Sequence, residues 1–216
     1  MNERKMMHIN GLTYHVNVIG NGPKIVVFLH GFTGRGENWE RIIPFINNKE
    51  LFTFVLPDIL GHGLSDKPKD AYRYSIENTV DDLHEMIKSI TEEKVYLIGY
   101  SMGGRIALSF ANNYPQLLQG LLLESASPGL RTEEERQLRQ QADENLAKKI
   151  EEDGINCFID FWTSIPLFES QKNLPVNQQQ KVLQQRLQND VTGLANSLRG
   201  IGTGSQPSYW EDLHSL

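Results

Sequence analysis

The sequence has one cysteine, no long apolar run and no excess of basic residues. Cys157 has no second cysteine with which to form an internal disulfide. No run approaches the roughly 18 apolar residues of a membrane-spanning helix, and no apolar stretch follows the charged first ten residues as in a signal peptide. Acidic residues outnumber basic ones, 27 to 21, for a net charge of −6. We therefore expect a cytoplasmic protein with no membrane or nucleic-acid partner.

Residues 1–126 alternate short apolar runs with amphipathic stretches, a pattern typical of α/β proteins whose mostly parallel sheet has helices on both faces. A half-exposed strand is predicted at residues 12–18, where apolar and polar side chains alternate. Four continuous apolar runs predict buried strands, at residues 25–29, 52–56, 95–98 and 121–123. Ser75 can cap a helix whose apolar residues recur every three or four positions up to Ile90.

Residues 127–205 have a different composition, and we refer to them as the lid segment. Ten of the chain's thirteen glutamines fall within residues 131–190, which contain no apolar run of the buried-strand kind. Thr132 and Glu135 have the spacing of a capping box, and the helix that they begin can end at Gly154. Further helices are predicted at residues 155–164, 176–188 and 191–199. The sequence thus predicts a helical insertion, after which residues 206–216 return to the core.

The clearest chemical motif is G-Y-S-M-G at residues 99–103. It directly follows a predicted strand and precedes an apolar helix, which is the context of a nucleophile elbow. In such an elbow the flanking glycines permit a sharp turn that lifts the serine hydroxyl clear of the sheet. We therefore expect Ser101 to be the nucleophile or base, and the alternative is an ordinary turn serine.

Two histidine-containing loops follow predicted strands. The loop that begins with His30, Gly31 and Phe32 is placed to offer the N–H of Phe32 to an oxyanion, and the N–H of Met102 is the second donor. For His30 we favour a structural role in holding this loop over a catalytic one. His62 also suits a structural turn, because in proteins that have a nucleophile elbow the catalytic histidine follows the serine in the chain.

Together these motifs resemble the α/β-hydrolase fold over essentially the whole chain, with the lid segment as its lid. The more specific motifs are G-Y-S-M-G-G-R-I-A-L at residues 99–108, E-S-A-S-P-G-L at 124–130, E-E-R-Q-L-R at 134–139, F-W-T-S-I-P-L-F at 161–168, Q-R-L at 185–187 and G-T-G at 202–204. They are similar to those of the 2-succinyl-6-hydroxy-2,4-cyclohexadiene-1-carboxylate synthases of menaquinone biosynthesis, the MenH family.

The resemblance implies a carbon–oxygen lyase that needs no cofactor or metal. Its reaction is the elimination of pyruvate from 2-succinyl-5-enolpyruvyl-6-hydroxy-3-cyclohexene-1-carboxylate. Ser101 would act as the base of a Ser-His-Asp triad, and the N–H groups of Phe32 and Met102 would hold the developing negative charge.

The substrate is a small polycarboxylate, for which planar guanidinium groups are well suited. Arg105 lies one helical turn beyond the serine, Arg139 falls within the apolar stripe of its predicted helix, and Arg186 occupies the matching position in Q-R-L. The charge of Arg139, embedded in that stripe, would need an anion from the protein or from a ligand. With Tyr100 and Trp162 these arginines form the expected substrate site, and ordinary salt bridging is the alternative for each arginine.

The acid and the histidine of the triad are not apparent in this sequence. In this fold both follow the lid, and His214 is the one histidine after Ser101. Because His214 precedes any strand that could present it, we expect the last strands of the fold to be missing from this chain. Truncation, cleavage or a separate C-terminal fragment that supplies both residues would each account for this. A complete but shortened hydrolase with a rearranged triad is the alternative.

Two other functions remain open for the sequence. The motif D-I-L-G-H-G-L-S-D-K-P at residues 58–68 is generic to serine hydrolases and fits a carboxylesterase. A non-catalytic binding module is the second. An inactive fragment is a further alternative for this chain alone, whatever the parent protein does. Ester hydrolysis without pyruvate release would favour the carboxylesterase, and the absence of both activities would favour the binding module.

Overall fold

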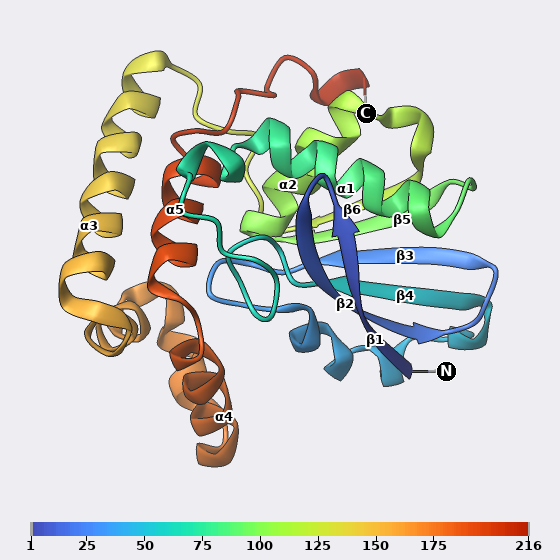
Figure 1. The fold of residues 1–216 in the computed structure, drawn as a ribbon, viewed down its shortest axis with the longest axis horizontal. Coiled ribbons are helices and arrows are strands. Elements are labelled where there is room, and N and C mark those ends of the chain that lie inside the picture. Colours follow the sequence, from blue (N-terminus) through green and yellow to red (C-terminus); the bar gives the residue numbers. More distant parts are fainter. Residues whose placement is uncertain (1, 216) are drawn as a thin grey trace.

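The computed structural model describes residues 2–215, which build a six-stranded sheet with helices around it (Figure 1). The strand order is β1-β2-β4-β3-β5-β6. The strands are β1 (Asn2–Ile9), β2 (Leu12–Gly20), β3 (Lys24–Leu29), β4 (Phe52–Pro57), β5 (Val95–Tyr100) and β6 (Leu118–Glu124). The pairs β4–β3, β3–β5 and β5–β6 are parallel, whereas the pairs β1–β2 and β2–β4 are antiparallel. The predicted mostly parallel sheet is confirmed.

Strand β1 was not predicted, because its side chains are mostly polar and exposed. It forms a hairpin with β2 through a turn in which Asn10 and Gly11 both have positive φ, 48° and 80°. An Asn-Gly pair is a favoured two-residue hairpin turn for this reason. The Asn10-Gly11 pair was therefore the sequence signal from which the β1–β2 hairpin could have been predicted.

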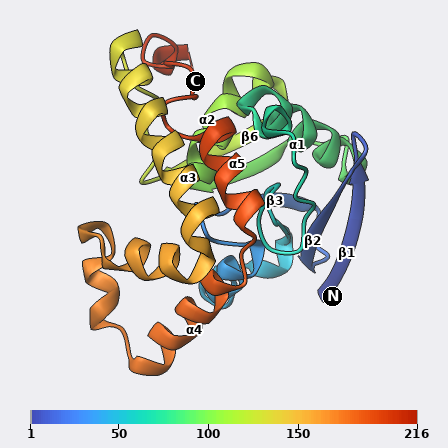
Figure 2. The same ribbon diagram turned by 60° about the vertical axis from the view of Figure 1, so that its left-hand side comes forward.

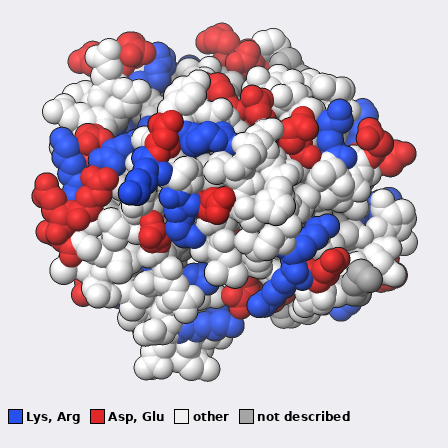
Figure 3. Space-filling view, viewed as in Figure 1, with Lys and Arg blue, Asp and Glu red and all other residues white. Residues whose placement is uncertain are grey.

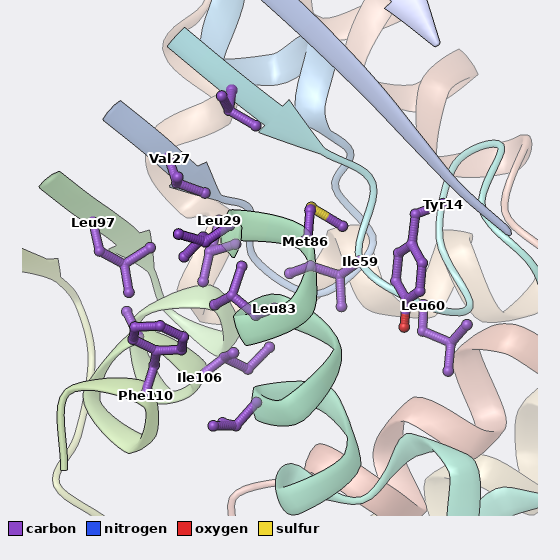
Figure 4. Packing of buried hydrophobic residues seen from close by; sticks show 14 of the residues in the cluster. Tyr14, Val27, Leu29, Ile59, Leu60, Leu83, Met86, Leu97, Ile106 and Phe110 are labelled. Atoms are coloured by element: carbon purple, nitrogen blue, oxygen red, sulfur yellow. The ribbon is translucent and has the colours of Figure 1, made fainter. Parts of the chain in front are cut away.

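Helices α1 (Ile76–Ile90) and α2 (Met102–Asn113) cover one face of the sheet. Ser75 caps α1 as predicted, since its hydroxyl accepts a hydrogen bond from the N–H of Asn78 at 3.2 Å. The main hydrophobic core lies between these helices and the sheet (Figure 4), where Leu97 of β5 and Phe110 of α2 are fully buried. This core fixes the carboxyl ends of β3 and β5 relative to α2.

The opposite face has no long helix among residues 2–215. Short 3₁₀ helices cover part of it: η1 (Gly36–Arg41), η2 (Ile43–Phe45) and η3 (Lys49–Leu51). Beside them an apolar groove of about 390 Å³ runs over β5 and β6. In the described residues no further strand pairs with β6, so its outer edge is unpaired.

The remaining elements are η4 (Ala71–Tyr74), η5 (Pro115–Leu117), α3 (Glu133–Ser164), η6 (Pro166–Asn173), α4 (Val176–Leu187), α5 (Val191–Ile201) and η7 (Leu213–Ser215). The predicted capping box of Thr132 and Glu135 begins α3. At Gly154 the backbone leaves helical geometry, with φ 77°, and a second helical part follows directly. No helix within residues 2–215 has the length and apolar character to cross a membrane.

The lid segment has its own hydrophobic cluster, centred on Ile150 and Phe158 of α3 and Leu194 of α5. Helices α3 and α5 lie side by side (Figure 2). Arg199 of α5 reinforces this contact through ion pairs with Glu144 and Glu151 of α3 at 2.8 and 2.6 Å. Positively and negatively charged side chains are interspersed over the face of the molecule that Figure 3 shows.

Candidate active site

Ser101 lies in a sharp turn between β5 and α2. Its φ of 52° and ψ of −112° place it in a region that non-glycine residues rarely adopt, and its N–H donates to the carbonyl of Glu124 at 2.9 Å. The glycines around it are required by close backbone contacts. A Cβ on Gly103 would lie 2.3 Å from the carbonyl oxygen of Leu29, and one on Gly99 would lie 2.4 Å from that of Gly103. This is the strained strand–turn–helix geometry expected of a nucleophile elbow.

A cavity of about 370 Å³ opens above Ser101. Its core side is formed by residues 30–34, Tyr100 and Ser101, and its lid side by Trp162, Phe168 and Arg186 among others. The cavity therefore brings together the predicted site residues Ser101, Phe32, Tyr100, Trp162 and Arg186. The buried Met102 begins α2 directly after the serine, where the first N–H groups of a helix have no partner within it.

His30 is held by hydrogen bonds on both ring nitrogens. Its Nδ1 lies 2.9 Å from the carbonyl oxygen of Gly31, and its Nε2 accepts from the N–H of Ile59 at 2.9 Å. The ring is therefore neutral with its proton on Nδ1, and burial lowers its pKa below the ordinary value. The structural role favoured for His30 is confirmed by these bonds, because neither nitrogen is available to Ser101.

His62 lies beneath the same loop. Its ring centroid is 5.1 Å from that of His30 and 5.8 Å from that of Phe32, and its Nδ1 lies 3.1 Å from the carbonyl oxygen of Leu60. Burial lowers the pKa of His62 to about 3, so the ring is neutral. It supports the loop from below, as expected for a turn histidine.

Arg186 is the cation on the lid side of the cavity. Arg186 as a whole is only 8% exposed, and its guanidinium lies 4.4 Å from the centre of the Phe168 ring. Within residues 2–215 no carboxylate pairs with it, and burial lowers its pKa. Trp162 packs against Phe168 at 5.7 Å and against Phe32 of the core at 5.4 Å. An unpaired guanidinium on an aromatic wall is suited to a carboxylate ligand.

The other two predicted arginines lie outside the cavity lining. Arg105 points from α2 to the lid segment, where its Nη2 donates to the carbonyl of Ile201 at 2.6 Å. Burial, followed by repulsion from Arg139, lowers its pKa to about 10. Arg139 pairs through Nε with the buried carboxylate of Asp143 at 2.8 Å. The Arg139 side chain is 46% exposed, so the prediction that it lies buried within an apolar stripe is wrong, and its anion partner comes from the protein itself. Substrate binding by these two arginines stays a prediction.

Comparisons with known proteins agree with this geometry. The family model for the alpha/beta hydrolase fold matches residues 24–164. A Bacillus subtilis (strain 168) protein assigned as 2-succinyl-6-hydroxy-2,4-cyclohexadiene-1-carboxylate synthase is 43% identical over 96% of this chain and 75% of its own length. A Haemophilus influenzae protein with the same assignment is 31% identical over 87% of this chain and 74% of its own. The structure of MenH from S. aureus has a TM-score of 0.84 and 31% identity, with 100% of this chain and 76% of that chain covered.

The chain belongs to the MenH family. Family members are 2-succinyl-6-hydroxy-2,4-cyclohexadiene-1-carboxylate synthases on an α/β-hydrolase scaffold. The chain spans about three quarters of the length of each of these relatives.

In this MenH family member no histidine reaches the serine within residues 2–215. Ser101 Oγ has no imidazole partner there, and the exposed His214 lies in η7. Among the described residues, Glu124 at the end of β6 supplies the only carboxylate on the cavity wall. Sequence reasoning quoted Glu124 in a motif but assigned it no role. The signal was its position at the carboxyl end of the strand beside β5, the sheet edge at which α/β proteins bind ligands.

Sequence reasoning also missed the side chains that join the two sides of the cavity. Asn38 and Gln185 line it from the core and from α4, and their side chains hydrogen-bond to each other at 2.9 Å. Arg35 joins the same helix end by donating to the carbonyl of Gln185 at 2.9 Å. The local sequence does not predict these hydrogen bonds, because the partners are about 150 positions apart in the chain and none of them belongs to a recognisable motif.

Proposed function

We propose that this chain carries the synthase chemistry of its family, the elimination of pyruvate from 2-succinyl-5-enolpyruvyl-6-hydroxy-3-cyclohexene-1-carboxylate. The main support is the cavity that sets Ser101 and the oxyanion loop on one side against the unpaired Arg186 on the other. A substrate with several carboxylates can place one on the guanidinium while its reacting centre lies at the serine. Tyr100, Trp162 and the lid residues around them supply the walls.

The reaction assigned to this site is a 1,4-elimination. Ser101, deprotonated by a histidine, removes the proton beside the succinyl carbonyl, and the N–H groups of Phe32 and Met102 hold the enolate oxygen. The electron pair moves through the ring, the second ring double bond forms, and the carbon–oxygen bond to the enolpyruvyl group breaks. The leaving group takes up a proton and becomes pyruvate. No acyl-enzyme is needed, which distinguishes this step from ester hydrolysis.

We further propose that the base partner of Ser101 comes from polypeptide beyond the described residues. Both ring nitrogens of His30 are bonded within the loop, and His62 does not line the cavity that opens above Ser101. A C-terminal fragment of the same protein that carries an aspartate and a histidine is the source we favour. Residues 1–126 would then form the first part of the core, residues 127–205 the lid and residues 206–216 the return to the core. We place the protein in the cytoplasm, in keeping with its lone cysteine.

The test combines an intact mass with an assay of pyruvate release. Where a second piece accompanies the chain, we expect pyruvate release that Ser101→Ala lowers by about a thousandfold or more, with ligand binding retained. Where only the chain is present, we expect no release, and activity there would overturn our account of the triad.

The carboxylesterase is separated from the synthase in the same preparations. Its support is the elbow and oxyanion loop, which an ester hydrolase also needs. Hydrolysis of p-nitrophenyl acetate without pyruvate release from the enolpyruvyl substrate would replace the synthase by the esterase. Neither activity in the presence of both pieces would leave a binding function.

A further inference from the structure

The loop that offers Phe32 to the oxyanion contains a strained β-turn. The N–H of Gly34 donates to the carbonyl of Gly31 at 2.9 Å, so Phe32 and Thr33 are the two central residues of the turn. Thr33 has φ 64°, and Phe32 is not among the residues with positive φ. This is the pattern of a type II turn, whose third position favours glycine. A β-branched residue there is strained and needs its surroundings to hold it.

The group that holds Thr33 comes from the lid segment. Asn189, just after α4, is 5% exposed, and its Nδ2 donates to the carbonyl of Thr33 at 3.0 Å. The same Nδ2 donates to the carbonyl of Arg186, also at 3.0 Å. One buried amide group therefore joins the strained turn to the backbone of the arginine that faces the cavity.

Further bonds fix the same helix end to the same loop. Arg35 donates through Nη2 to the carbonyl of Gln185 and through Nη1 to Oε1 of Gln188, both at 2.9 Å. Asn38 adds its bond to the side chain of Gln185 at 2.9 Å. Because these bonds flank Arg186, the position of its backbone and that of the turn are tied together.

We propose that Asn189 is a positioning residue: through it, the conformation of the turn at residues 31–34 depends on the position of Arg186. Without this amide, the carbonyl of Thr33 loses its partner from the lid segment, and the turn, which is strained by the positive φ of Thr33, opens more often. A carboxylate on Arg186 steadies the end of α4 and, through Asn189, the turn. By linkage, an oxyanion at the turn strengthens carboxylate binding by the same factor. This inference rests on the proposed function for the identity of the ligand. The hydrogen bond from Asn189 to the turn is present without ligand.

The first experiment follows amide hydrogen exchange at Gly34 in the ligand-free chain. Asn189→Leu should speed this exchange at least tenfold, because the turn opens more often. Asn196→Leu is the matched control: Asn196 is an equally buried lid asparagine, whose Nδ2 donates to the carbonyls of Pro68 and Lys69 at 3.2 Å, away from the cavity. Exchange at Gly34 should be unchanged in the control, and equal effects of both variants would overturn the proposal.

A rescue variant separates positioning from general support. Adding Thr33→Gly to Asn189→Leu removes the penalty of a positive φ, so exchange at Gly34 should return to within about threefold of the original rate. A purely structural asparagine predicts no such rescue, and its absence would contradict the proposal. The glycine also provides a readout if Asn189→Leu alone is too unstable to study.

The second experiment measures the coupling with 2-succinylbenzoate as the probe. This stable dicarboxylate should slow exchange at Gly34 in the unmodified chain, and Asn189→Leu should weaken its binding about tenfold and abolish that slowing. Failure of the unmodified chain to bind the probe would count against the proposed function alone, since exchange without ligand still decides the role of Asn189. Normal binding and normal slowing in Asn189→Leu would overturn the coupling.

Discussion

The two sides of the cavity are built by different means. On the core side the backbone shapes the site through the sharp turn at Ser101, and close contacts between main-chain atoms fix this turn. On the lid side a side chain, Arg186, faces the cavity from a helix that polar hydrogen bonds attach to the core. Backbone geometry of the first kind is encoded locally by glycines, whereas the second depends on contacts between distant segments. The core side should therefore tolerate change least.

Gly103→Ala should produce the largest effect. The added Cβ would meet the backbone of Leu29 and His30, with the nearest atom at 2.3 Å, and no side chain can move to relieve this. We expect a loss of more than about 3 kcal/mol in the free energy of unfolding, together with loss of pyruvate release. Urea unfolding measures the first quantity.

The control for that change is Gly120→Ala on β6. There the added Cβ would meet only the ring of Tyr96, at 3.1 Å, and the ring can shift. We expect a change of less than about 1 kcal/mol. Similar losses in the two variants would show that the tight backbone contact at the elbow is not what makes the core side intolerant.

Arg186→Met should affect ligand binding more than stability. The methionine keeps the contact with Phe168 but removes the charge, so the affinity for 2-succinylbenzoate should fall by about 10- to 100-fold, or about 1.4–2.8 kcal/mol. Isothermal titration calorimetry measures this, with the exposed Lys181→Met on the same helix as control. Equal affinities in the two variants would remove Arg186 from the binding site.

His62 makes stability depend on pH on the core side. Its folded-state pKa of about 3 lies below the unfolded value of 6.5, so the folded chain binds fewer protons. The stabilisation is complete above pH 6.5 and is lost as the pH falls toward 3, which amounts to about 2 kcal/mol between pH 7 and pH 5. Buried His30 contributes in the same direction.

His62→Asn should remove its part of this dependence, since asparagine can still donate to Leu60 but does not titrate. Urea unfolding at pH 7 and pH 5 gives the difference, with the partly exposed His84→Asn on α1 as control. A variant that loses as much stability as the unmodified chain between these pH values would assign the acid sensitivity to other groups.

The sequence predicted the core side well because its signals are local. The apolar runs located the strands β3, β4, β5 and β6, and the motif around Ser101 located the turn that the structure contains. The prediction that β6 is buried is wrong, because Leu122 and Leu123 are exposed within the described residues. The lid side was predicted less completely. Arg105 lies one turn from Ser101 as its spacing required, yet its long side chain reaches Ile201 of α5. Spacing fixes where a Cα lies on a helix, but the partner of a long side chain depends on which segment packs above it.

Gly154→Ala tests the lid side with the smallest expected effect. Gly154 has φ 77°, as the elbow has its own positive φ at Ser101, but nothing lies within 4 Å of the position of an added Cβ. Only the backbone penalty of alanine applies, so we expect a loss of about 1 kcal/mol in urea unfolding, with Asp153→Ala as the exposed neighbour for control. A loss as large as that of Gly103→Ala would mean that the bend in α3 is as tightly constrained as the elbow. A gain in stability would mean that α3 straightens through this position, and the lid would then be held by its hydrogen bonds to the core rather than by the bend.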